Sequence, residues 1–183
     1  MQVQHLYRSI LENQSYPLYH GTDLNSLVGI FDSKVIDAGI NRSYQGEPRG
    51  VSFTRDISTA LRFVNHSGDI EGAVLVADRA VLRQRYRIVP FAYKEPTLPR
   101  HKTHSGAAIG PDLDEQEEIV LAREIPLSLI EHILIRPEWI RQMDDQFALE
   151  ELAYNYDETI GQIKTRIEFI LADRRIRTQW RGL

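Results

Sequence analysis

Short apolar segments alternate with polar ones along the chain, and their spacing predicts a mixture of strands and helices. Compact apolar runs bounded by glycine, proline or polar residues predict strands over 16–20, 50–54, 72–78, 86–89, 117–122 and 132–135. Apolar residues at helical spacing predict helices over 3–12, 24–32 and 79–84. Another helix is predicted to begin at a cap, Asp56 or Ser58, and to end near Ser67. The chain after Pro137 is also predicted to be helical. We expect Gly21 to end the first strand, with Thr22 or Asp23 capping the helix that follows.

Two segments, 39–50 and 94–114, hold glycine, proline and polar residues without periodicity, so they predict loops. A loop as long as the second one inside a compact domain is usually functional or disordered.

The C-terminal part of the chain predicts helices that dock through one face. Acids outnumber bases over 136–163, whereas bases outnumber acids over 164–183. A basic end can contact a phosphate backbone, but a solvated face that complements the preceding acidic helices is the simpler interpretation. The last helix carries an apolar stripe, formed by Ile160, Ile163, Ile167, Ile170 and Leu171.

The length and composition are those of one domain with a substantial core. The chain has 183 residues, of which 42% are hydrophobic, and a formal net charge of −4. We expect a single domain over 1–183, with a core over 1–135 and a helical C-terminal extension over 136–183. The negative net charge argues against a protein that binds nucleic acid through an overall positive charge. It does not exclude a local basic surface.

The composition also excludes several classes of site. The chain has no cysteine, which excludes disulfides, thiolate nucleophiles and cysteine metal sites. Its first residues lack the basic and long apolar regions of a signal peptide, and no apolar run reaches the length of about 20 residues that spans a bilayer. We therefore expect a cytoplasmic protein without membrane association.

Three motifs carry candidate chemistry, and their order and spacing matter more than any one of them. They are His20-Gly21-Thr22 at a strand end, the strand-to-helix unit Gly50–Phe63, and the acid-led strand Glu115–Leu121. A glycine after a strand lets the backbone approach a ligand closely. A glutamate that opens a strand can place a carboxylate where positive charge develops on a sugar.

In this order the three motifs resemble the ADP-ribosyltransferase superfamily, specifically the branch of diphtheria toxin and the poly(ADP-ribose) polymerases. The resemblance implies an α+β fold with two packed, mostly antiparallel sheets and an NAD cleft. It also implies a glycosyltransferase that uses NAD as substrate and needs no metal. Such an enzyme transfers a mono-ADP-ribosyl group to a macromolecular acceptor, either protein or nucleic acid.

The resemblance assigns roles to individual residues. Glu117 stabilises the oxocarbenium ion and is catalytic together with His20, while Glu115 guides the acceptor beside a recognition loop over 94–114. The resemblance places His20, Gly21, Thr22, Ser52, Thr54 and Phe63 in the NAD site. His20 is expected to bond the ribose on the adenosine side.

Arg55, at the start of the helix in the second motif, has two interpretations. Together with Arg42 it contacts the NAD pyrophosphate, or it forms a surface ion pair with Asp56.

Two features depart from the branch. Ser52 stands where a stacking tyrosine is usual, and Tyr44 in the preceding loop is a candidate to replace that ring. Glu115-Gln116-Glu117 has the Glu-x-Glu spacing of the arginine-specific branch, and strand alternation puts both carboxylates on one face. Glu118 is then expected on the opposite face, and replacing it with glutamine is expected to change the rate of nicotinamide release very little.

Two other functions stay open. An RNA 2′-phosphotransferase shares the fold and the His-Gly-Thr motif, and a catalytically inactive binding module would keep the fold after losing the tyrosine. A metal site is not expected, because neither His101 and His104 nor Asp112 and Asp114 have a complete ligand set.

Overall fold

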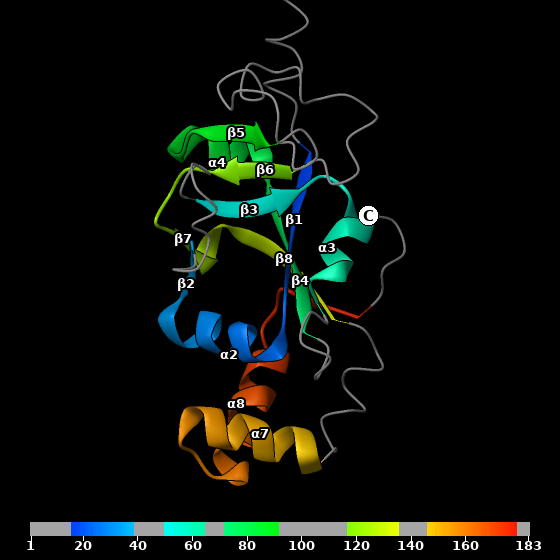
Figure 1. Ribbon diagram of the computed structural model, residues 1–183, viewed down its shortest axis with the longest axis vertical. Coiled ribbons are helices and arrows are strands. Elements are labelled where there is room, and N and C mark those ends of the chain that lie inside the picture. Colours follow the sequence, from blue (N-terminus) through cyan, green and yellow to red (C-terminus); the bar gives the residue numbers. More distant parts are fainter. Residues whose placement is uncertain (1–15, 39–49, 65–71, 92–116, 136–145, 179–183) are drawn as a thin grey trace, which may run out of the picture.

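The computed structural model describes residues 16–38, 50–64, 72–91, 117–135 and 146–178 (Figure 1). At Pro90, Phe91, Glu117, Phe147 and Ala148 it describes the backbone alone. The predicted N-terminal helix and both predicted loops lie wholly or mostly outside these residues.

A seven-stranded sheet forms the centre of the molecule, with the strand order β5-β6-β3-β1-β4-β8-β9. Its strands, in chain order, are β1 (Pro17–Thr22), β3 (Val51–Thr54), β4 (Ala73–Asp78), β5 (Ile88–Phe91), β6 (Glu117–Val120), β8 (Ile130–Leu134) and β9 (Ile176–Arg177). Among the described strands only β8 and β9 pair in parallel. The α+β class and the mostly antiparallel pairing therefore agree with the sequence.

A second, two-stranded sheet pairs β2 (Val35–Asp37) with β7 (Glu124–Pro126). The sequence pattern predicts none of β2, β7 and β9. Strands of two or three residues are too short to show alternation, and each exists only because a distant partner supplies its hydrogen bonds.

The helices are α2 (Leu24–Ser33), α3 (Ile57–Arg62), α4 (Arg79–Arg85), α7 (Gln146–Tyr156) and α8 (Ile160–Leu171), with the short 3-10 helix η2 (Leu127–Leu129). Acidic or hydroxyl side chains cap the start of α2, α3, α4 and α8. Asp23 caps α2 and Asp56 caps α3, as the sequence predicts, while Thr159 and Gln162 form a capping box on α8.

Two boundaries differ from the sequence prediction. Gly21 does not end the first strand, because β4 pairs with β1 through Gly21 and Thr22. α3 ends at Arg62, earlier than the predicted end near Ser67, and Phe63 is its C-cap. β1 therefore reaches further and α3 stops sooner, so Thr22 and Phe63 come to lie in the same cleft.

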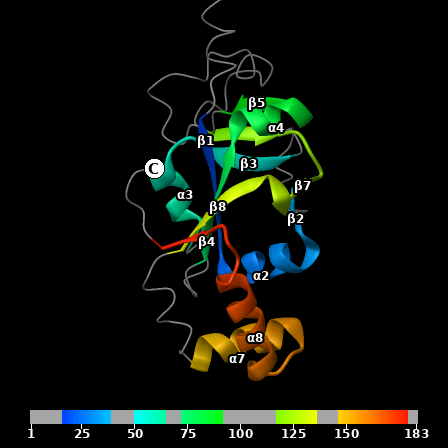
Figure 2. The ribbon, with the colours of Figure 1, turned by 180° about the vertical axis from the view of Figure 1, so that it is seen from behind.

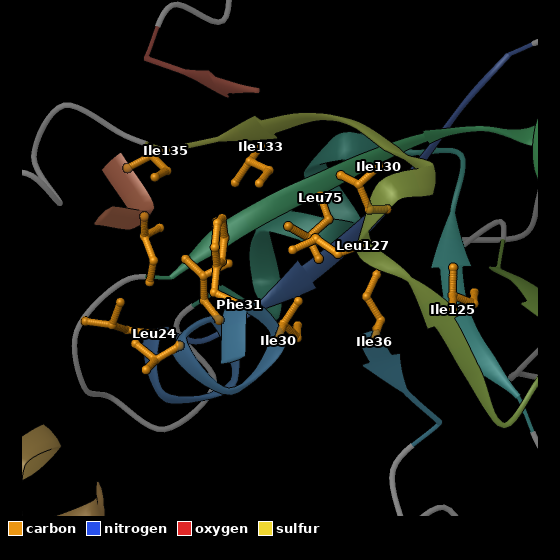
Figure 3. Close-up of a cluster of buried hydrophobic side chains, with 14 of the residues drawn as sticks. Leu24, Ile30, Phe31, Ile36, Leu75, Ile125, Leu127, Ile130, Ile133 and Ile135 are labelled. Carbon is orange, nitrogen blue, oxygen red and sulfur yellow. The ribbon is translucent and has the colours of Figure 1, made fainter. Parts of the chain in front are cut away.

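The two faces of the large sheet bury separate clusters. One face packs against α2, and Figure 3 shows Phe31 of α2 near Leu75 of β4 and Ile133 of β8 in this cluster. The other face carries Tyr19 and packs against Ala60 of α3. Alternate residues of β1 and β4 therefore face opposite layers, as strand geometry requires.

The C-terminal helices join the first cluster, and the predicted docking stripe is confirmed. Ile163, Ile167 and Ile170 of α8 are at most 4% exposed. Arg166 ties α8 to α2, because its guanidinium forms an ion pair with Asp32. Both ribbon views show α7 and α8 beside α2 at one end of the molecule (Figures 1 and 2).

Two features are absent from the described part of the chain. None of its helices is long and apolar enough to cross a membrane. In the same residues no group of three or more histidine, cysteine, aspartate or glutamate side chains is placed to hold a metal ion.

Candidate functional site

A cleft of about 480 Å³ lies where the end of β1 meets α2, β2 and the C-cap of α3. It contains His20, Gly21, Thr22 and Phe63, all of which the sequence places in one site. The full lining is His20, Gly21, Thr22, Asp23, Ser26, Gly29, Ile30, Ser33, Val35, Ile36, Asp37 and Phe63.

Gly21 allows α3 to approach the end of β1. A Cβ atom on this residue would lie 1.9 Å from the carbonyl oxygen of Ala60 and 3.0 Å from Cβ of Phe63. The glycine is thus required by the close packing of the helix, as well as being suited to backbone contact with a ligand. This packing also places Phe63 at the rim of the cleft, where 40% of its surface is exposed.

The backbone on one side of Gly21 is open to other partners. β4 pairs with β1 along its whole length, whereas β3 pairs with β1 at Tyr19. Within the described residues the sheet therefore opens between β1 and β3 just before the cleft, which is where a ligand can meet backbone groups.

Gly21→Ala is expected to destabilise the fold by about 1–3 kcal/mol, because the added methyl group forces the C-terminal turn of α3 away from β1. Chemical denaturation with urea measures this loss. Gly161→Ala is a suitable control, since a Cβ there has no neighbour closer than 3.9 Å. Equal stability of the two variants would show that α3 does not depend on close contact with Gly21.

His20 is held in one orientation by the strand beside it. Its Nδ1 lies 2.8 Å from the carbonyl oxygen of Ser52. Because a carbonyl oxygen can only accept, Nδ1 carries the proton and Nε2 of the neutral ring is an acceptor. The ring also packs 5.6 Å from the Phe53 ring, centroid to centroid.

The structure places two predicted pocket residues outside this lining. Ser52 is half-buried and contacts the cleft residue His20 through its backbone. Thr54 is buried, and its Oγ1 accepts a hydrogen bond from the backbone N–H of Asp56 at 3.0 Å. Thr54 therefore supports the start of α3.

The charge of the described cleft lining is acidic. Asp23 and Asp37 are its two acidic side chains, and the described lining contains no lysine or arginine. The Asp23 carboxylate accepts hydrogen bonds from the backbone N–H and hydroxyl of Ser26, at 2.7 and 3.0 Å. A pyrophosphate bound in the cleft would need its counter-charge from residues outside this lining.

A second polar cluster surrounds Glu118, which is 1% exposed. The Tyr16 hydroxyl donates to Oε1 at 2.6 Å, and Nε of Arg79 donates to Oε2 at 2.5 Å. Nε of Arg55 lies 2.8 Å from Oε1 as an ion pair without hydrogen-bond geometry. Burial, reinforced by the Glu118 carboxylate, raises the pKa of Tyr16 well above its usual range.

These contacts give Glu118 a structural role that its sequence position did not predict, so Glu118→Gln is now expected to affect stability. Strand alternation alone does not reveal which acid faces the core. In the antiparallel pairing of β6 with β3, Glu118 lies opposite the buried Phe53, whose ring contacts His20. Directly opposed residues share a face of the sheet, so Glu118 lies on the face that carries His20.

Arg55 pairs with Glu118, while Asp56 caps α3 and has no ion pair with Arg55 in the described structure. The Arg55 guanidinium also lies 5.4 Å from the centre of the Tyr16 ring. Burial acts to raise the pKa of the Asp56 carboxyl, but hydrogen bonds from Thr59 and Ser58 outweigh it and leave that pKa lowered. The surface pair between Arg55 and Asp56 is therefore replaced by two separate interactions.

Several predicted residues lie outside the described part of the chain. These are Tyr44, Arg42, Glu115, the loop over 94–114 and the histidines within it. The backbone of Glu117 is described and pairs with Thr54 of β3.

Comparisons with known proteins give distant similarities. No family model and no curated protein matches the chain. Thermus sp. 2.9 DarT in complex with NAD+ is similar in structure, with a TM-score of 0.46 and 17% identity over 90% of this chain and 96% of that one. The same protein in complex with carba-NAD+ gives a TM-score of 0.43 and 19% identity over 89% and 95%. At these values the similarity assigns neither a family nor a function.

Proposed function

We propose that the protein is an NAD-dependent mono-ADP-ribosyltransferase that acts in the cytoplasm on a macromolecular acceptor. The observation that carries the proposal is the cleft at the end of β1, where His20, Gly21 and Phe63 come together. Such an enzyme breaks the bond between nicotinamide and ribose, so it must hold the nicotinamide ring and stabilise the sugar cation.

The geometry of the cleft supports binding of the dinucleotide. Phe63 lines the cleft and is 40% exposed, and an aromatic ring in such a position can stack on nicotinamide. Gly21 offers backbone groups on the side away from β4, which suit the carboxamide of nicotinamide. His20 has a fixed ring whose Nε2 can accept a hydrogen bond from a ribose hydroxyl.

Glu117 is proposed as the carboxylate that stabilises the oxocarbenium ion, on the strength of the motif that it shares with the superfamily. Its backbone lies in β6, directly beside β3. Glu118 is the second candidate, because the register puts it on the sheet face of His20. Its carboxylate is already engaged by Tyr16, Arg55 and Arg79, which favours a supporting role.

The remaining assignments complete the proposed site. Glu115 and the loop over 94–114 are proposed to receive the acceptor. Thr22, Ser52, Thr54, Tyr44 and Arg55 are proposed to help hold NAD.

Release of nicotinamide from NAD by the purified protein tests the proposal. We expect release with NAD alone, by slow transfer to water, and faster release when the acceptor is present. NAD binding without release would indicate an inactive binding module. Absence of both would refute the proposed function.

His20→Ala is expected to weaken NAD binding about tenfold or more without unfolding the domain, because a hydrogen bond from the ligand is lost at a half-exposed position. Calorimetry measures the affinity, and circular dichroism checks the fold. His132→Ala, on β8 and outside the cleft lining, is the matched control. If both variants bind NAD as the wild type does, the cleft is not the NAD site.

A further inference from the structure

Two carboxylates line the cleft, that of Asp23 directly after β1 and that of Asp37 at the end of β2. Asp37 is exposed. In the β2–β7 ladder Asp37 lies directly opposite Glu124, so two exposed carboxylates share one face of the small sheet. Neither carboxylate has an ion pair with another described residue, although like charges in this position are unfavourable for the sheet.

Asp37 differs from the other acid of the cleft. The Asp23 carboxylate is occupied by the cap of α2, where it accepts two hydrogen bonds from Ser26. The Asp37 carboxylate has no hydrogen bond within the described structure and faces a cavity. Its charge is therefore available to act on whatever the cleft contains.

The cleft is long enough for its two ends to contact different parts of a ligand. Ser26 and Ser33 both line it, and seven residues of α2 correspond to about 10 Å of rise. If nicotinamide occupies the end with Gly21 and Phe63, the adenosine half of the dinucleotide, whose ribose is assigned to His20, extends along the cleft toward Asp37.

We propose that Asp37 makes this cleft selective for NAD over NADP, an inference that rests on the proposed function. The two dinucleotides differ only by a 2′-phosphate on the adenosine ribose, which adds close to two negative charges at neutral pH. Within a cleft wall a carboxylate a few ångströms away repels such a group by an amount worth about tenfold or more in affinity. Glu124 adds to the repulsion from the neighbouring strand.

The test measures dissociation constants of NAD and NADP for the wild type and for Asp37→Asn, by calorimetry at low salt. We expect the wild type to bind NADP about tenfold or more weakly than NAD. In Asp37→Asn this ratio should fall several-fold, mainly because NADP binds better, and Asp37→Lys should lower it further. Raising the ionic strength should shrink the wild-type ratio, since salt screens exposed charges.

Glu131→Gln is the control for a change in net charge, because Glu131 is exposed on β8 and outside the cleft lining. It should keep the wild-type ratio. A wild type that binds NAD and NADP equally, or a ratio that stays unchanged in both Asp37 variants, would overturn the role of Asp37 while leaving the proposed function intact. A wild type that binds no NAD would refute the proposed function itself, and the selectivity with it.

Discussion

Glu118→Gln is expected to lower the free energy of unfolding by about 3–5 kcal/mol. The substitution keeps the shape of the side chain but removes the charge that compensates two guanidinium groups. Arg79 is buried and Arg55 is 21% exposed at its side chain, so neither can recover full hydration. The Tyr16 hydroxyl also loses a charged acceptor in a partly buried position.

Urea denaturation of the wild type and the variant measures the loss. Glu131→Gln is the matched control, since the same chemical change at an exposed position typically alters stability by less than about 0.5 kcal/mol. Adding Arg79→Met to Glu118→Gln should restore part of the stability, because it removes one of the two guanidinium groups that pair with the Glu118 carboxylate. A Glu118→Gln variant as stable as the control would mean that the cluster does not hold β6 in place.

Glu117→Gln is expected to reduce the rate of nicotinamide release about a hundredfold or more, with little change in thermal stability. Glutamine keeps the size and hydrogen-bonding capacity of the side chain while removing the charge that meets the oxocarbenium ion. Initial rates of nicotinamide release at saturating NAD measure the effect, and differential scanning calorimetry checks the fold.

The roles of Glu117 and Glu118 are distinguished by measuring both the rate of nicotinamide release and the unfolding temperature of each variant. Glu118→Gln should lower the unfolding temperature, whereas Glu117→Gln should lower the rate alone. Rates are measured well below the unfolding temperature of Glu118→Gln, so that this variant is folded in the assay. If nicotinamide release then survives Glu117→Gln and collapses in Glu118→Gln, the catalytic role belongs to Glu118 on the sheet face of His20.

Elements that depend on local chemistry were predictable from the sequence. Asp23 and Asp56, each one of two candidates at its helix start, cap the helices that they precede, because each carboxylate reaches backbone N–H groups two or three residues ahead. The apolar stripe of α8 is set by helical spacing alone, and Ile163, Ile167 and Ile170 are buried as expected. The motif around His20 likewise falls at the end of a strand and on the wall of a cleft.

Other features depend on residues that are far apart in the chain. These are the pairing of β2 with β7, which places Asp37 beside Glu124, the approach of Ala60 to Gly21, and the burial of Glu118. Glu118 accepts one of its hydrogen bonds from Tyr16, a residue 102 positions away in the chain. Spacing along a strand shows that neighbouring side chains point to opposite faces, but it does not show which face is buried. That choice depends on what the rest of the fold brings to each side of the sheet, and here it brings Tyr16, Arg55 and Arg79 to Glu118.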